Sequence, residues 1–476
     1  MFNDFYIVLI GRIIQVITSV SILRIMTSIL PPEEMGKYAL ITAATTFFSL
    51  VLINPVGMYI NRYLHQWKNS GVLFSRSIES TLYFGVVALI ASITVAFLSV
   101  SHSINLAMDK TFLALIVFGN LFFVTLNQTV IPSINMLGKR AHYVILSTLT
   151  LWISLGASVI LTKQVSLAEY WIAGQIIGSL LGTIIALKPF LSIVGLRNSG
   201  GTLFCRSEIR ILIAFSIPVS IAVGLNWLQF QSYRFIISEL LSLEFLGLFV
   251  AGYSVSAGIL NAFETTATQY FYPLFYEKIN DADSQEISEA WSKYASRLVP
   301  LTLLTTIFVC VLAEALSHLL LSRNFWNVSW FIICGAIIEA CRVLGNMYGM
   351  IAHATLKTRF LVKPQLVGAI MVVVLTPIAV YFFGGYGVGF ALILSSLLYL
   401  TSMHFSMVKL LEIKRHYYGF VYLLSFIFLE FIIKQLRLVF ESAFFADFTI
   451  TCISGILYLY MFYRIMRRAD YNDDSV

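Results

Sequence analysis

Long apolar runs separated by short polar segments recur along the whole sequence. A helix that crosses the hydrocarbon core of a bilayer needs about 20 mostly apolar residues. Fourteen segments meet this requirement: 5–29, 38–61, 78–99, 112–135, 141–161, 168–187, 211–233, 245–269, 298–316, 328–352, 364–383, 387–408, 419–437 and 447–463. The N-terminal residues lack the basic stretch and cleavage site of a signal peptide, so we expect the first segment to remain as a helix. The pattern predicts an all-α polytopic membrane protein with fourteen transmembrane helices.

The distribution of Lys and Arg orients these helices. If the N-terminus faces the cytoplasm, 21 of the 31 basic residues fall in inner loops, 7 fall in outer loops and 3 lie inside spans. Basic residues concentrate on the cytoplasmic side of membrane proteins. Both termini are therefore expected to be cytoplasmic, and so are the two longest loops, 188–210 and 270–297.

Composition excludes several other classes of protein. The 476 residues are 59% hydrophobic and 12% charged, whereas soluble domains carry about 25% charged residues and disordered chains have low hydrophobicity. The net charge of +7 follows from the basic inner loops and does not indicate binding of nucleic acid. The five scattered cysteines form no C-x-x-C pair, and the chain has no Walker A sequence. We therefore expect no metal, no cofactor and no enzymatic activity.

Two pairs of matching segments indicate an internal duplication, which is common in transporters. The segment RIMTSILPPEEMGKY at the end of the first span is similar to RFIISELLSLEFLGLF at the end of the seventh, with Gly36 aligned to Gly247. Further along, Asn127 aligns with Asn346. The sequence thus predicts one six-helix lobe over residues 1–200, a second over 201–412, and two appended helices within 413–476.

The chain resembles a known family at these positions. The R-x-(about eight)-E-x-x-G-x-Y/F element, the duplication and the basic turn LGKRAHYV after the fourth span are similar to the polysaccharide-transporter branch of the multidrug/oligosaccharidyl-lipid/polysaccharide (MOP) exporter superfamily. Its Wzx-type members are flippases for undecaprenyl-pyrophosphate-linked oligosaccharides, such as O-antigen repeat units. The resemblance implies a V-shaped bundle with a central cavity and alternating access, in the bacterial cytoplasmic (inner) membrane. It also implies a polysaccharide polymerase and a chain-length regulator as partners.

Polar side chains inside apolar spans are the candidate functional residues, because ionisable groups at membrane depth are costly unless they are paired or hydrated. In the tenth span, Glu339, Arg342, Asn346, Gly349 and His353 follow one helix face. We expect this stripe to line the cavity. The structural alternative is an ion pair between Glu339 and Arg342 that serves packing alone.

Amide side chains form a second candidate set. The fourth span carries Asn120, Asn127 and Gln128, which serve either as interhelical links or as hydrogen-bonding groups for sugar hydroxyls. Asn54 precedes Pro55 in the second span, where we expect the proline to interrupt the helix. Together with Asn346, these four residues are the expected sugar-binding set.

Three arginines are the expected pyrophosphate ligands. They are Arg12 and Arg24 in the first span and Arg342 in the tenth. Arginine is the expected residue type because a guanidinium donates paired hydrogen bonds to phosphate. For Arg12 and Arg24 the alternative is an extended side chain that reaches the membrane surface.

Two carboxylates are candidates for proton coupling. Glu264 in the eighth span has no basic residue within one turn of its own helix, so Glu264 or Glu339 is expected to carry a proton. In contrast, Glu430 and Lys434 in the thirteenth span are four residues apart and are predicted to form a structural ion pair.

These predictions support a flippase for a lipid-linked oligosaccharide, and other functions remain open. A lipid II flippase would need the same cationic cavity. A drug/cation antiporter is favoured by Glu264 and disfavoured by the three intramembrane arginines. An integral-membrane glycosyltransferase or polymerase is disfavoured because every predicted outer loop is short.

Overall fold

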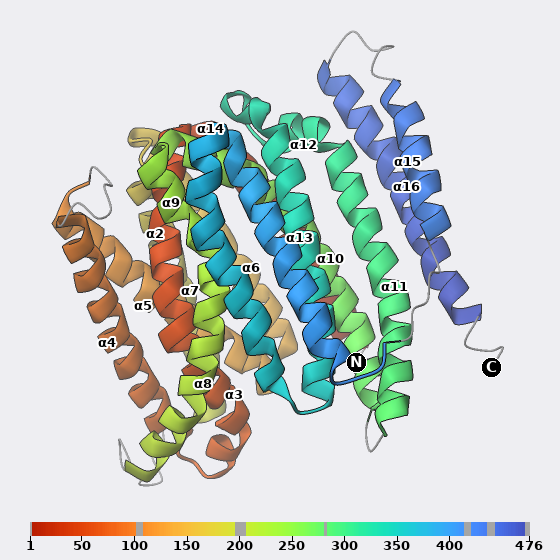
Figure 1. Ribbon diagram of the computed structural model, residues 1–476. Coiled ribbons are helices and arrows are strands. Elements are labelled where there is room, and N and C mark those ends of the chain that lie inside the picture. The colour runs from red at the N-terminus through yellow and green to blue at the C-terminus, as the bar shows by residue number, and fades with distance from the viewer. Residues whose placement is uncertain are drawn as a thin grey trace. The chain divides into compact units, whose positions relative to one another are not determined.

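The structure is a computed structural model that describes residues 2–100, 108–195, 206–279, 283–413, 420–435 and 443–471 (Figure 1). Within these ranges every regular element is helical. The chain forms two compact units, Met1–Gly247 and Leu248–Val476. The predicted lobe boundary at residue 200 stays a prediction, whereas the observed contacts group the next two helices with the first unit.

The described residues of the first unit form nine α-helices and the first turn of a tenth. They are α1 (Phe2–Ile29), α2 (Pro32–Phe48), the π-helical turn η1 (Ser49–Ile53), α3 (Asn54–Asn69), α4 (Leu73–Val100), α5 (Lys110–Met136), α6 (Arg140–Gln164), α7 (Ala168–Val194), α8 (Arg206–Gln231), α9 (Tyr233–Leu240) and the start of α10 (Leu243–Lys278).

The second unit holds the rest of α10 and all later elements. They are α11 (Ser284–Val311), α12 (Ala313–Leu320), the 3-10 helix η2 (Arg323–Val328), α13 (Ser329–Ala354), the 3-10 helix η3 (Thr358–Leu361), α14 (Val362–Val408), α15 (Phe420–Gln435) and α16 (Ala443–Tyr471).

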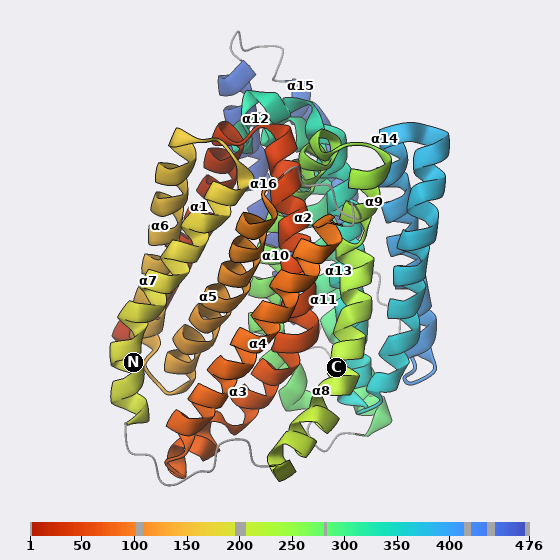
Figure 2. The same cartoon turned by 90° about the vertical axis from the view of Figure 1, so that its left-hand side faces the viewer.

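Among the described residues, eleven helical stretches are long and apolar enough to cross a membrane, and two shorter apolar helices, Ile17–Ile29 and Leu423–Ile433, accompany them. One of the eleven, Thr358–Met407, contains all but the last residue of α14, whose 47 residues would measure about 70 Å if straight. Instead α14 folds back on itself at Gly384, which has φ +57°, and Figure 2 shows its two arms side by side. The predicted turn between the eleventh and twelfth spans is therefore a single glycine.

The predicted interruption at Pro55 takes a different form. The helix does not break before Asn54-Pro55 but widens into the π-turn η1. Proline has no N–H to donate to the preceding turn, and a π-turn accommodates the lost hydrogen bond without ending the helix. Tyr83 of α4 donates its hydroxyl to the Leu52 carbonyl at 2.8 Å, so one carbonyl of the widened turn is bonded by a side chain.

The repeat-related glycines lie at a close helix contact. A Cβ on Gly36 would meet the Leu243 carbonyl, and a Cβ on Gly247 would meet the Pro32 carbonyl. The offset of 211 that aligns Gly36 with Gly247 also aligns Pro32 with Leu243. The two contacts are therefore the same contact made twice, as expected if α2 and the first turn of α10 are related by a pseudo-twofold axis.

Small residues bring α6 and α7 together. Gly174, Gly178 and Gly182 recur every four residues on α7, and a Cβ on any of them would collide with Ser158, Ser154 or Thr150 of α6, respectively. Such small-residue spacing allows two membrane helices to approach closely. The two helices are therefore closely packed along these three turns.

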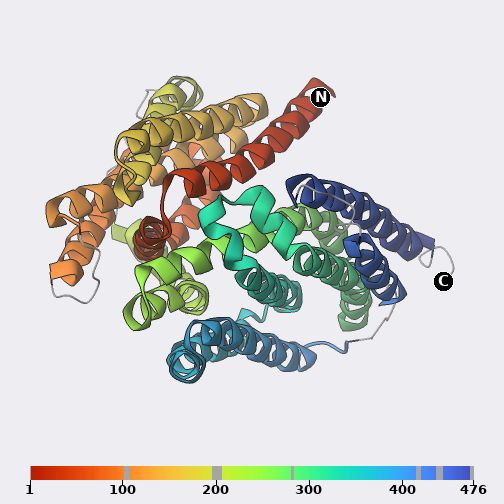
Figure 3. The ribbon, with the colours of Figure 1, turned by 90° about the horizontal axis from the view of Figure 1, so that it is seen from above.

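The core of the second unit lies where α10, α11, α13 and α14 meet α15 and α16. Trp291 of α11 is 2% exposed and donates its indole N–H to the Met347 carbonyl of α13 at 3.2 Å. Figure 3 shows the dark-blue helices α15 and α16 beside the green α11.

Glu430 of α15 accepts a hydrogen bond from Ser454 of α16 at 2.9 Å. The side chain of its predicted partner Lys434 lies outside the described residues.

Candidate polar site in the second unit

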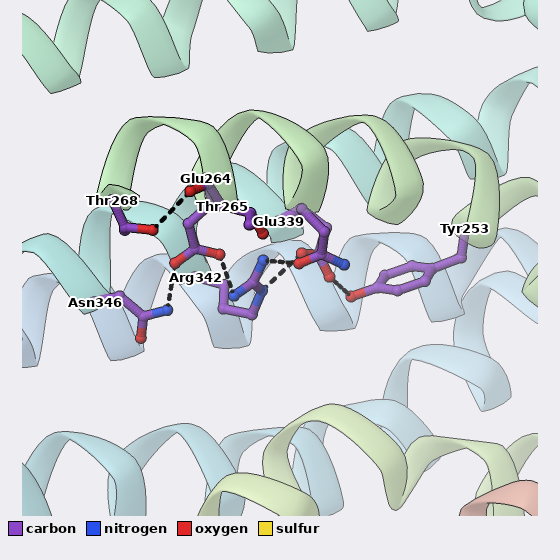
Figure 4. A network of polar contacts seen from close by, with 8 residues as sticks. Tyr253, Glu264, Thr265, Thr268, Glu339, Arg342 and Asn346 are labelled. Carbon is purple, nitrogen blue, oxygen red and sulfur yellow. Dashed lines mark hydrogen bonds and ion pairs between the residues drawn. The ribbon is translucent and has the colours of Figure 1, made fainter. Parts of the chain in front are cut away.

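A network of charged and amide side chains joins α10 to α13 (Figure 4). Arg342 of α13 is at its centre. Its Nε lies 2.7 Å from Glu339 Oε2, and its Nη1 lies 2.7 Å from Glu264 Oε2 of α10. Its Nη2 donates to Asn261 Oδ1 at 2.5 Å. All three nitrogens of the guanidinium are therefore bonded within the network.

The remaining carboxylate oxygens are bonded as well. Tyr253 of α10 donates its hydroxyl to Glu339 Oε1, and Asn346 of α13 donates its Nδ2 to Glu264 Oε1 at 2.7 Å. The side chain of Glu339 is 5% exposed, whereas those of Glu264 and Arg342 are 15% and 19% exposed. Glu339 thus lies at the buried end of the network, and Asn261 and Asn346 are exposed.

The network contains two carboxylates, Glu264 and Glu339, and one arginine, Arg342. When both carboxylates are ionised, its net charge is −1. The sequence identified the pair Glu339–Arg342 from its spacing of three residues, and that pair is present. Glu264 has no basic neighbour on its own helix, and its partner comes from α13. The spacing of residues along one helix cannot predict a partner that lies on another helix.

A polar pocket of about 300 Å³ adjoins this network. The stripe predicted on α13 continues into it, because Asn346, Gly349 and His353 line the pocket. Other lining residues come from α10, η3 and α14: Tyr272, Tyr276, Leu361, Gln365, Tyr399 and Met403. The tyrosines and Gln365 were missed at the sequence level, since tyrosine counts as hydrophobic and Gln365 stands at the polar end of a span.

The predicted amides of the first unit have different environments. Asn127 of α5 is 9% exposed, and its Nδ2 lies 3.2 Å from the Ser179 carbonyl and 3.3 Å from Thr183 Oγ1, both on α7. It links helices, which was one of its two expected roles. Asn120 is half-buried, while Gln128 and Asn54 are exposed.

The predicted arginines of α1 are only partly described. Arg24 is half-buried. The side chain of Arg12 lies outside the described residues, although its backbone is helical. In the described part of the chain, no group of three or more His, Cys, Asp or Glu side chains is arranged to hold a metal ion.

Comparison with solved structures gives the fold. The chain is similar to the lipid II flippase MurJ in its inward closed conformation, with a TM-score of 0.64, 14% identity, and coverage of 98% of this chain and 99% of that one. It is also similar to a multidrug resistance MATE family transporter of the MOP superfamily in its inward-facing conformation, with a TM-score of 0.60, 12% identity, and coverage of 83% and 94%. The chain has the fold of these MurJ and MATE structures.

A structure described as the outward-facing conformation of a MATE family transporter aligns with a TM-score of 0.51 at 13% identity, covering 84% of this chain and 93% of that one. No family model matches the chain, and no curated protein matches its sequence. The expected all-α fold is confirmed by its similarity to these structures, and assignment to the MOP superfamily and its Wzx-type branch stays a proposal.

Proposed function

We propose that the protein is a flippase that moves a pyrophosphate-linked oligosaccharide on an undecaprenyl carrier across the bacterial cytoplasmic membrane. The observation that carries the proposal is the polar face of α10 and α13, which runs from the ion-pair network into a pocket lined by tyrosines and amides. Lipid tails offer no hydrogen bonds to such a face. It is suited to a polar head group in transit.

The transport problem explains why such a face is needed. A sugar head group and its pyrophosphate cannot cross about 30 Å of hydrocarbon unaided. A polar path replaces their hydration while the polyprenyl tail stays in lipid. In alternating access, rocking of the two repeat units opens that path to one side and then to the other.

Arg342 can bind a phosphate only in exchange for one of its present partners. We assign that exchange to Glu264, which is more exposed than Glu339. Protonation of Glu264 removes its attraction for the guanidinium, so Arg342 Nη1 becomes available to an incoming phosphate oxygen. Deprotonation restores the ion pair and favours release. In this scheme Glu264 couples proton movement to substrate exchange, while Glu339 keeps the guanidinium oriented.

The remaining phosphate ligands would come from Arg12 and Arg24 of α1. The exposed or half-buried amides Asn54, Asn120 and Gln128 are the proposed sugar contacts in the first unit, and Asn346 has that role in the second. Asn127 is left out because its amide N–H groups are used between helices.

Reconstitution tests the proposal. Purified protein in proteoliposomes should flip undecaprenyl-pyrophosphate-linked disaccharide, measured as loss of accessibility to an external glycosidase, and an imposed pH gradient should accelerate it. Glu264→Gln should abolish the response to the gradient. Flipping at the protein-free rate would contradict the proposal, and an unchanged gradient response in Glu264→Gln would contradict the proton role.

Two other functions have specific observations in their favour. Similarity to MurJ over nearly the whole chain favours lipid II as the cargo, and adding lipid II to the same assay tests it directly. The excess carboxylate of the network and the similarity to MATE transporters favour a drug/cation antiporter. Proton-driven uptake of tetraphenylphosphonium into the same vesicles would support that alternative.

A further inference from the structure

The pocket beside the ion-pair network is formed entirely within the second unit. Tyr272 belongs to α10, Asn346 and Gly349 belong to α13, and Gln365 and Tyr399 belong to the two arms of α14. Its volume of about 300 Å³ is at the lower end of the range for ligand sites. It has room for a single small ring and not for an extended chain.

Two glycines of α13 shape this pocket. A Cβ on Gly345 would collide with the ring of Tyr399, so the glycine lets that ring lie against the helix. A Cβ on Gly349 would meet only Leu361 Cδ2, at 3.6 Å, and the rest of its surroundings are open. Side chains at both positions would reduce the space between α13 and α14.

The pocket offers hydrogen-bond acceptors. The buried Oε1 of Gln365 has no hydrogen-bond partner within the part of the chain that the structure describes. A buried acceptor without a donor is unfavourable, so this atom needs a donor from a ligand or from water. Asn346 donates one N–H of its Nδ2 to Glu264, and its Oδ1 is a second acceptor beside the pocket.

These groups select a class of ligand. A sugar hydroxyl both donates and accepts, so it can use the amide oxygens as well as the amide N–H groups and tyrosine hydroxyls of the lining, whereas a phosphate ester is mainly an acceptor and leaves the amide oxygens without a donor. Tyr272 and Tyr276 supply aromatic rings that combine an apolar face with a polar hydroxyl. We infer that this pocket binds one pyranose ring of the transported saccharide and leaves the pyrophosphate to the arginines. The inference rests on the proposed function and assigns one part of the substrate to one pocket.

Saturation-transfer NMR on the full-length protein in nanodiscs tests the inference. The probes are methyl glycosides of glucose, galactose, rhamnose and N-acetylglucosamine, each with and without inorganic pyrophosphate. At least one glycoside should receive saturation, and pyrophosphate should not displace it. Gln365→Leu removes the unbonded acceptor and should weaken binding about tenfold. Gly349→Leu fills the pocket and should have at least the same effect.

Gly455→Leu on α16 is the matched control, because a Cβ at Gly455 has open space around it and the residue is not in the pocket. It should bind like the wild type, and all variants should give the same elution profile in size-exclusion chromatography. No saturation of any glycoside, displacement by pyrophosphate, or equal binding by the Gln365 and Gly349 variants would overturn the inference. If these results occur while proteoliposomes still flip the disaccharide lipid, the pocket assignment fails alone; absence of flipping refutes the proposed function instead.

Discussion

The ion-pair network predicts an asymmetry between its acidic and basic members. Arg342 contacts Glu264 and Glu339 at 2.7 Å each, so Arg342→Leu leaves two carboxylates facing each other without a cation. Glu264→Gln leaves a balanced pair between Arg342 and Glu339 and keeps an oxygen that accepts from Asn346. The arginine variant should therefore be strongly destabilised and the glutamine variant only slightly.

The expected magnitudes follow from burial. Removal of one partner from a buried ion pair costs about 3–5 kcal/mol, and the partial exposure of Arg342 and Glu264, 19% and 15%, lowers this to roughly 2–3 kcal/mol. For units of this size, 1 kcal/mol corresponds to about 2–4 °C in Tm. Arg342→Leu should therefore lower the Tm by roughly 4–12 °C, and Glu264→Gln by about 2 °C or less.

Thermal unfolding in detergent, followed by intrinsic tryptophan fluorescence at pH 7.5, measures both variants. The triple variant Arg342→Leu/Glu264→Gln/Glu339→Gln serves as the control, because it removes every charge together and should recover at least half of the loss. Equal Tm values for Arg342→Leu and the wild type, or a larger loss for Glu264→Gln than for Arg342→Leu, would refute the reasoning.

Three further predictions concern the first unit. Gly178→Leu should prevent close packing of α6 and α7 and lower the yield of monodisperse protein in size-exclusion chromatography, whereas Gly156→Leu, with open space at its Cβ, should elute like the wild type. Tyr83→Phe should destabilise the π-turn by about 1 kcal/mol, visible as a small drop in Tm; no drop would mean that its hydrogen bond contributes nothing. Arg24→Ala should reduce flipping of the disaccharide lipid at least tenfold at normal protein abundance, and wild-type flipping would remove Arg24 from the phosphate site.

The helices and the faces that their side chains share could be predicted from the sequence. The predicted apolar segments lie mainly on helical residues, because apolar length is a property of local sequence. Eleven described stretches are long and apolar enough to cross a membrane, so the count of fourteen spans stays a prediction. The stripe on α13 was also predicted, since residues three or four apart share a helix face. The alignment of Gly36 with Gly247 indicated a pair of positions that proves to be a close contact.

The rest depended on which helices lie side by side. The partner of Glu264 is on α13, the partners of Asn127 are on α6 and α7, and the ring of Tyr399 reaches Gly345 across α13 and α14. No spacing along one helix contains this information. The effect of Pro55 was missed for a different reason: a proline removes one hydrogen bond, and the local sequence does not tell whether the helix then ends or widens into a π-turn.

The central claim is that the face of α10 and α13 around the network is in contact with water and substrate. Cysteine accessibility tests this most directly, in a functional background without the five native cysteines. Asn346→Cys should react with a membrane-impermeant maleimide and be protected by the disaccharide lipid, while Ile370→Cys on the exposed apolar face of α14 should stay unlabelled. An unreactive Asn346→Cys, or labelling equal to that of Ile370→Cys, would contradict the account.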